Sequence, residues 1–251
     1  MSTTGILIDE KEKVNWEDVF LDEENRRALN QLMKEFTYID ELKKYNLPVN
    51  NKVLLHGYSG CGKTTTAKAI ATSLKKPLYI LDLSNFISSR IGDTAKNIRL
   101  IFDKVNRENA VLFLDEFDHI GKMRGNDDKD VGEMRRLVNS IIQMVDNFSE
   151  KALLIAATNH IDILDVALIR RFQLRISFAM PSEEELDSYY DFLLSKFPEE
   201  LQVVSRRYGI SFAEARDYIF TEIKSNLINE LERKNKPVVS QSYNLKSSPY
   251  S

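Results

Sequence analysis

The segment Gly57–Thr64 has the residue types and the spacing of a loop that holds phosphate groups. Its sequence GYSGCGKT fits the pattern G-x-x-x-x-G-K-[ST], and it stands between an apolar run and a stretch of helical character. Glycines allow main-chain N–H groups to turn inward around phosphate oxygens, and the start of a helix adds positive potential there. A chance match in a glycine-rich turn is the alternative, but strand, glycines, lysine and threonine all occur in the required order. The segment therefore predicts a nucleoside triphosphate site.

Two side chains of this loop have distinct expected roles. Lys63 would place its cation on the β- and γ-phosphates, and the hydroxyl of Thr64 would hold Mg²⁺. The other residues expected to contact the nucleotide are Gly57, Tyr58, Ser59, Gly60, Cys61, Gly62 and Thr65.

A second motif, VLFLDEFD at residues 111–118, carries the carboxylates that hydrolysis needs. Its apolar residues predict a buried strand that ends in Asp115 and Glu116. Asp115 would orient Mg²⁺ and its waters, and Glu116 would polarise the attacking water near the γ-phosphate. A strand end followed by solvated acids is the alternative, and the phosphate loop upstream argues against it. Binding alone would not require Glu116, so the pair indicates hydrolysis.

Short apolar runs alternate with helical stretches through the first two thirds of the chain. Runs this apolar suit strands that are covered on both faces, and their alternation with helices predicts an α/β fold with a parallel sheet. Five strands are expected, at Val53–His56, Leu78–Leu83, Val111–Leu114, Leu153–Ala157 and Arg175–Phe178.

The pattern changes at Pro181. The segments SEEE and SFAE, which begin at Ser182 and Ser211, both fit a capping box that opens a helix, and no strand-like alternation follows. We therefore expect a small helical domain after the α/β core. The predicted division is an N-terminal arm at 1–22, a core at 23–180, a helical lid at 181–236 and a disordered tail at 237–251.

Composition excludes several classes of protein. The net charge of −3 and the pI of about 5.8 argue against a nucleic-acid partner. The single cysteine, Cys61, rules out an internal disulfide framework and favours a cytoplasmic location. The N-terminus does not read as a signal peptide, and no stretch approaches the roughly 20 apolar residues of a membrane span. The three histidines lack metal-ligand spacing, so no zinc site is expected.

With both motifs in place, the chain resembles the AAA ATPase family, and more closely its FtsH-like and proteasomal-ATPase-like members, as a stand-alone bacterial-type module. The similarity runs from about residue 25 to about residue 230. It implies ATP as the nucleotide and a sheet order of 5-1-4-3-2. The segment LLIAATN resembles the sensor-1 strand of the family, which implies that Asn159 helps to hold the attacking water or the γ-phosphate.

Two further stretches extend the resemblance. ALIRRF resembles the family's arginine-finger segment, which implies that Arg170 or Arg171 reaches the γ-phosphate of a neighbouring subunit; without the Pro-Gly found in many members, which of the two does so stays open. SFAEARD takes the place of a Ser-Gly-Ala-Asp sequence in the helical lid, with Phe212 where the glycine is expected. Arg216 is either a substitute sensor or part of a surface salt bridge.

The chain departs from the family where threading members carry an aromatic–aliphatic–glycine tripeptide in a pore loop. The matching residues are Arg90, Ile91 and Gly92, with arginine in place of the aromatic ring. A guanidinium grips neutral side chains less well than a ring but pairs with carboxylates or phosphates.

These resemblances imply Mg²⁺-dependent ATP hydrolysis in a homo-oligomeric ring, most often a hexamer, because the finger acts between subunits. Two hypotheses remain for its use. The first is a remodeller or unfoldase of a protein partner. The second is an ATP-dependent switch that regulates a separate effector, for example a peptidase, without threading, and Arg90 favours it. A nucleic-acid motor is a third reading, against which the acidic charge argues. Because the recognised motifs fill most of the sequence, we expect the substrate or effector to be a separate chain.

Overall fold

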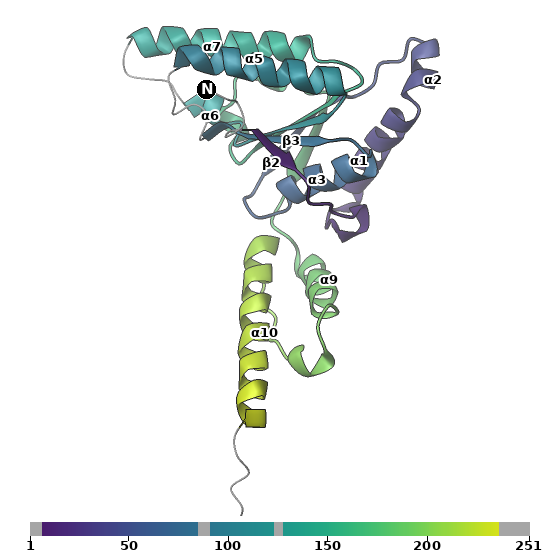
Figure 1. The fold of residues 1–251 in the computed structure, drawn as a ribbon, viewed down its shortest axis with the longest axis vertical. Helices are drawn as coiled ribbons and strands as arrows, with labels where there is room; N and C mark the ends of the chain where they lie inside the picture. Colours follow the sequence, from purple (N-terminus) through teal and green to yellow (C-terminus); the bar gives the residue numbers. More distant parts are fainter. Residues whose placement is uncertain (1–6, 85–90, 123–127, 236–251) are drawn as a thin grey trace, which may run out of the picture.

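The computed structural model describes residues 7–84, 91–122 and 128–235 of the chain. A six-stranded sheet forms its centre (Figure 1). In chain order its strands are β1 (Leu7–Glu10), β2 (Lys52–Gly57), β3 (Leu78–Asp82), β4 (Val111–Asp115), β5 (Leu153–Thr158) and β6 (Leu174–Phe178).

The order of the sheet is β1-β3-β4-β5-β2-β6. The prediction of five strands in the order 5-1-4-3-2 is therefore wrong for the sheet as a whole, because residues placed in the N-terminal arm add β1, which pairs antiparallel with β3. Only that edge of the sheet differs from the prediction. The five parallel strands adjoin one another as β6-β2-β5-β4-β3, at the positions of the five apolar runs.

Helices cover both faces of this sheet, which explains why its central strands are apolar throughout. On one face lie α1 (Glu23–Thr37), α2 (Ile39–Lys44) and α3 (Lys63–Ser73), and on the other α5 (Ile91–Glu108) and α7 (Asp128–Asp146) (Figure 1). Side chains of β2 show the division: Val53 and Leu55 pack with α1 and α3, whereas Leu54 belongs to the cluster that includes α5 and α7. This alternation follows from the period of two in a strand.

The helical character expected after Pro181 is present. Residues 181–235 contain α9 (Glu183–Leu194), a short 3-10 helix (Glu199–Leu201) and α10 (Phe212–Asn235), and Figure 1 shows them beside the sheet as a separate pair of helices. They have their own apolar cluster, made by residues such as Leu186, Tyr190, Ala215 and Ile219. Both predicted capping boxes are formed: Ser182 exchanges hydrogen bonds with Glu185, and Ser211 does so with Glu214.

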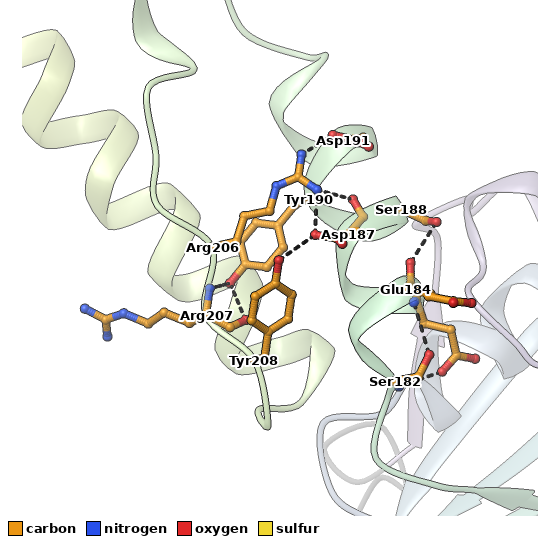
Figure 2. A network of polar contacts seen from close by, with 10 residues as sticks. Ser182, Glu184, Asp187, Ser188, Tyr190, Asp191, Arg206, Arg207 and Tyr208 are labelled. Atoms are coloured by element: carbon orange, nitrogen blue, oxygen red, sulfur yellow. Dashed lines mark hydrogen bonds and ion pairs between the residues drawn. The ribbon is translucent and has the colours of Figure 1, made fainter.

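A polar network holds the segment before α10 against α9 (Figure 2). Arg206 forms ion pairs with Asp187, at 2.6 Å, and with Asp191. The Tyr190 hydroxyl accepts a hydrogen bond from the backbone N–H of Arg207 and donates one to its carbonyl, both at 3.0 Å. The connection into α10 is therefore fixed at several points, which in turn fixes where Ser211 begins that helix.

The N-terminal arm follows one side of the core after β1. Lys68 of α3 forms ion pairs with Glu10, at 2.9 Å, and with Glu12, at 2.6 Å. Further along, the ring of Phe20 lies among three rings of the helical segment, with centroid separations of 4.9 Å to Tyr189, 5.4 Å to Phe192 and 5.7 Å to Phe212. The arm therefore touches the sheet edge, the helix that follows the phosphate loop, and the C-terminal helices.

Two predicted segments, the pore loop and the C-terminal tail, lie partly or wholly outside the described residues. Arg90 and the tail at 237–251 lie outside the described residues, while Ile91 and Gly92 are the first residues of α5. The domain boundaries stay predictions. Among the helices of the described ranges, none is long and apolar enough to cross a lipid bilayer.

Candidate functional site

The loop between β2 and α3 contains three glycines in uncommon backbone conformations. Gly57, Gly60 and Gly62 have φ angles of 127°, 73° and 102°, which favour glycine. A Cβ on Gly57 would lie 2.1 Å from the carbonyl oxygen of Phe178, the last residue of β6. The N–H of Tyr58 donates a 3.0 Å hydrogen bond to the same oxygen. The end of β6 therefore sets the start of the loop.

Lys63, the first residue of α3, is buried and aimed back at this loop. Its ammonium group donates hydrogen bonds to the carbonyl oxygens of Gly57, at 2.8 Å, and Tyr58, at 2.7 Å. Burial lowers the pKa of Lys63 from its ordinary value, and the nearby Cys61 and Asp115 oppose that shift. The ammonium group of Lys63 is thus held against the loop, where it would contact the oxygens of a bound phosphate.

Thr64 and Asp115 come together from α3 and the end of β4. The threonine hydroxyl donates to Asp115 Oδ2 at 3.4 Å, and the N–H of Glu116 donates to the other carboxylate oxygen at 2.9 Å. Burial raises the pKa of Asp115 above its ordinary value. A hydroxyl and a carboxylate side by side are the oxygen donors that Mg²⁺ accepts, so these residues fit that ion. Outside this pair, the described residues include no cluster of three His, Cys, Asp or Glu side chains suited to a metal.

Glu116 and Asn159 follow neighbouring strands at the same edge of the sheet. Glu116 comes directly after β4 and has a φ of 51°, an uncommon value for a residue other than glycine. Its side chain is half exposed and lies 3.2 Å from Nε2 of His119. Asn159 comes directly after β5 and is exposed. Between them, Thr158 donates a 2.9 Å hydrogen bond to the buried Asp118, which joins the two strand ends.

The two candidate finger residues, Arg170 and Arg171, differ in their surroundings. Arg171 is tied within its own chain: it forms an ion pair with Asp146 of α7 at 3.2 Å and donates to the carbonyl of Ala167 at 2.6 Å. Arg170 is exposed at the end of α8 (Val166–Ile169), and its side chain contacts no polar partner in the described residues.

The helical segment meets the phosphate loop at Gly60. The N–H of Ala213 donates a 3.1 Å hydrogen bond to the Gly60 carbonyl, and a Cβ on Gly60 would lie 2.6 Å from Oγ of Ser211. Arg216 instead lies beside Asp217, at 3.7 Å, with a half-exposed side chain. The small side chains of Ser211 and Ala213, on either side of Phe212, therefore allow close approach to the loop.

A cavity of about 110 Å³ beside the loop is lined by Cys61 and by residues that the sequence analysis did not assign to the site. Its walls come from the arm, α1, the loop, β6 with the residues after it, and the helical segment, and include Phe20, Asn25, Cys61, Phe178, Met180 and Phe212. These residues share no local pattern, because they are far apart in the chain. The unusual Phe212 was the one available signal.

Comparison with known proteins agrees with this geometry. The model of the family described as "ATPase family associated with various cellular activities (AAA)" matches residues 53–180. The chain is 36% identical over 217 residues to "Uncharacterized AAA family ATPase y4kL" of Sinorhizobium fredii, covering 85% of this chain and 66% of the relative. It is 30% identical over 178 residues to a "Putative 26S proteasome regulatory subunit homolog" of Methanothermobacter thermautotrophicus, covering 70% and 47%.

Two further matches are a much longer relative and a solved structure. "Peroxisomal ATPase pex6" of Schizosaccharomyces pombe is 32% identical over 180 residues, covering 69% of this chain and 19% of the relative. The chain thus spans at most about two thirds of these curated relatives. The crystal structure of the FIGL-1 AAA domain superposes with a TM-score of 0.71 over 93% of this chain and 80% of that one, at 23% identity, which shows a common fold. By its family model and its relatives, the chain belongs to the AAA ATPase family.

Proposed function

We propose that the chain hydrolyses ATP with the aid of Mg²⁺ at the loop between β2 and α3. The observation that carries this proposal is the 3.4 Å approach of the Thr64 hydroxyl to the Asp115 carboxylate, next to Lys63 and Glu116. It joins the two motifs, which are far apart in the chain, into one site. Family membership supports the same reaction.

Each residue of this site has a chemical task in the proposed reaction. The loop N–H groups and Lys63 would bind the phosphates, while Thr64 and Asp115 would hold Mg²⁺, which offsets phosphate charge. Glu116 would accept the proton of the attacking water, and Asn159 would help to orient that water or the γ-phosphate. The exposed side chains of Glu116 and Asn159, at adjacent strand ends, are accessible to a ligand on the loop.

The cavity beside Cys61 suggests where the base of the nucleotide lies. Its aromatic and apolar walls, among them Phe20 and Met180, would shield a flat ring from water, and its volume of about 110 Å³ is small enough to require close packing. Because the walls come from the core and from the helical segment, bound nucleotide would draw the two together. We therefore propose that residues 181–236 act as a lid.

The proposed site is completed by a second copy of the chain. Arg171 is held by Asp146, which leaves Arg170 as the finger that reaches a neighbouring nucleotide. A cation there would stabilise the charge that develops on the transferred phosphoryl group. A closed ring gives every copy one such neighbour, and we propose a homohexamer.

Two uses of the hydrolysis cycle follow from the proposed ring. The first is remodelling or unfolding of a separate protein partner, which the proteasomal and peroxisomal names of two relatives support. The second is an ATP-dependent switch that controls a separate effector, and Arg90 in place of an aromatic residue favours it. Substitution of Ile91 separates them: it would abolish partner processing by a threading machine and leave a switch largely working.

The hydrolysis proposal is tested by Glu116→Gln, which keeps the size of the side chain and removes its basicity. We expect release of inorganic phosphate from ATP to fall by roughly 10²–10⁴-fold while nucleotide binding persists. Glu24→Gln, an exposed glutamate on α1, is the matched control and should keep the wild-type rate. Unchanged turnover in Glu116→Gln would contradict the proposed role of this residue.

A further inference from the structure

We propose that His119 is a positioning residue for Glu116: its imidazole fixes the carboxylate that is to receive the proton of the attacking water. The proposal rests on the hydrolysis proposed above and adds a residue to it. Neither the two motifs nor the resemblance assigned His119 a role in the site.

The contact between the two side chains is short and specific. Nε2 of His119 lies 3.2 Å from Oε2 of Glu116. The backbone N–H of His119 also donates a 3.0 Å hydrogen bond to the carbonyl oxygen of Glu116. Two polar contacts therefore join the same pair of residues across one turn.

The turn that joins the residues is built from uncommon backbone. Glu116 has a left-handed φ of 51°, and His119 begins the short helix α6 (His119–Lys122). The turn is anchored to the sheet at Phe117, whose N–H donates a 2.8 Å hydrogen bond to the carbonyl of Ala157 in β5. A left-handed residue other than glycine costs roughly 1–2 kcal/mol, and such strain persists where the surrounding structure fixes it. Here that structure directs both side chains to the same side of the turn.

Burial does not account for the contact. The Glu116 side chain is 45% exposed and that of His119 is 35% exposed, so hydrophobic packing does little to hold them together. A free glutamate side chain at such a site would sample several rotamers. The imidazole restricts it by holding one carboxylate oxygen, which leaves Oε1 to accept a proton from water.

Glu116 stands beside another acid in the chain, so its contact with the basic side chain of His119 is significant. The neighbour of Glu116 along the chain is Asp115, a second carboxylate, and in the described residues His119 is the one basic side chain within 4 Å of the Glu116 carboxylate. An imidazole with hydrogen on Nε2 donates to a carboxylate whether it is neutral or charged. The positioning role therefore does not depend on protonation of His119.

The proposal is tested by steady-state ATP hydrolysis with the full chain in its assembled form. His119→Ala should lower kcat by roughly tenfold and leave KM within about twofold, because orientation of the base is lost while nucleotide contacts remain. His119→Gln should restore most of kcat, since its amide can donate to Oε2 from a similar distance. Thermal unfolding of each variant shows whether the fold is kept.

A double variant distinguishes positioning from a general structural effect. If His119 acts through Glu116, adding His119→Ala to Glu116→Gln should reduce single-turnover hydrolysis by less than about twofold further. An unchanged kcat in His119→Ala, an effect on KM alone, or an equal loss in the Glu116→Gln background would overturn the positioning role. Wild-type chain that releases no phosphate would overturn the hydrolysis proposal as well, so the two failures are distinguishable.

Discussion

At the scale of single residues, the glycines of the phosphate loop show what a motif can and cannot specify. Their spacing predicted a loop between a strand and a helix, because that signal depends on neighbouring residues in the chain. It did not predict that Gly57 lies against the Phe178 carbonyl, or that Gly60 lies against Ser211. Those contacts come from segments more than a hundred residues away, so they needed the structure.

Gly60→Ala should weaken both the loop and its contact with α10. The new methyl group would lie 2.6 Å from Oγ of Ser211, on a backbone with a φ of 73°. We expect a loss of roughly 1–3 kcal/mol in the free energy of unfolding and a several-fold rise in KM for ATP, measured by chemical denaturation and by phosphate release.

Two other glycines serve as controls for this substitution. Gly209 also has a positive φ, of 70°, but has open space around it, so Gly209→Ala measures backbone strain without a clash. Gly132 lies within α7 with no atom in reach of a new Cβ, and Gly132→Ala should leave stability equal or slightly higher. A KM for Gly60→Ala no different from that of these two variants would contradict the proposed contact with the lid.

At the scale of secondary structure, the elements with strong local signals were predictable. The five apolar runs became β2 to β6, and the two capping boxes lie where their sequences place them. In contrast, β1 has only four residues, of intermediate or full exposure, and its pairing depends on the free edge of β3. A short strand of that kind has no hydrophobic period to reveal it.

Lys68→Met should loosen the N-terminal arm, because Lys68 joins it to α3 through Glu10 and Glu12. We expect a loss of about 1 kcal/mol in the free energy of unfolding near neutral pH. Lys34→Met, an exposed lysine of α1, is the control and should change little. If the two variants unfold alike at pH 7, the ion pairs contribute nothing measurable.

The same pair of lysine variants predicts a pH dependence. The hydrogen bond from Lys68 holds the pKa of Glu10 below its ordinary value of 4.5, so the stabilisation is present above that pH and is lost as pH falls through the lowered pKa. Burial alone would lower the pKa of Lys68, but hydrogen bonds to Glu12 and Glu10 raise it above 10.5. The difference between wild type and Lys68→Met should thus be constant from about pH 5 to 10 and shrink below pH 4.5.

At the scale of the whole molecule, the site brings together distant parts of the chain. The motifs predicted Lys63, Thr64, Asp115 and Glu116, and the structure places the middle two in contact. The walls of the adjoining cavity and the position of His119 were not predicted, since the first depends on the packing of the helical segment and the second on the turn after β4.

Mixing inactive variants tests whether the site spans two copies. The Lys63→Ala variant keeps Arg170, and the Arg170→Ala variant keeps an intact phosphate loop. A working site should therefore form where the loop of an Arg170→Ala copy meets the finger of a Lys63→Ala copy. Random pairing makes about a quarter of the interfaces competent, and we expect roughly that share of wild-type phosphate release on mixing. Activity no higher than that of the separate variants would contradict a finger that acts between subunits.

Arg171→Ala is the matched comparison for this experiment. Because Arg171 is bound to Asp146 and to the Ala167 carbonyl, its loss should lower the temperature of unfolding and give no such gain on mixing with Lys63→Ala. Arg99→Ala, an exposed arginine of α5, should leave both measurements unchanged. Recovery with Arg171→Ala in place of Arg170→Ala would reverse the assignment of the finger.

The path of the N-terminal arm has a practical consequence for handling the protein. An affinity tag fused ahead of residue 7 would start beside the outer strand of the sheet, close to the segment that Lys68 holds and upstream of Phe20. A tag joined after Asn235 would instead leave from the far end of α10, which points away from the sheet (Figure 1). Surface immobilisation and pull-down work are therefore better designed around the far end of α10.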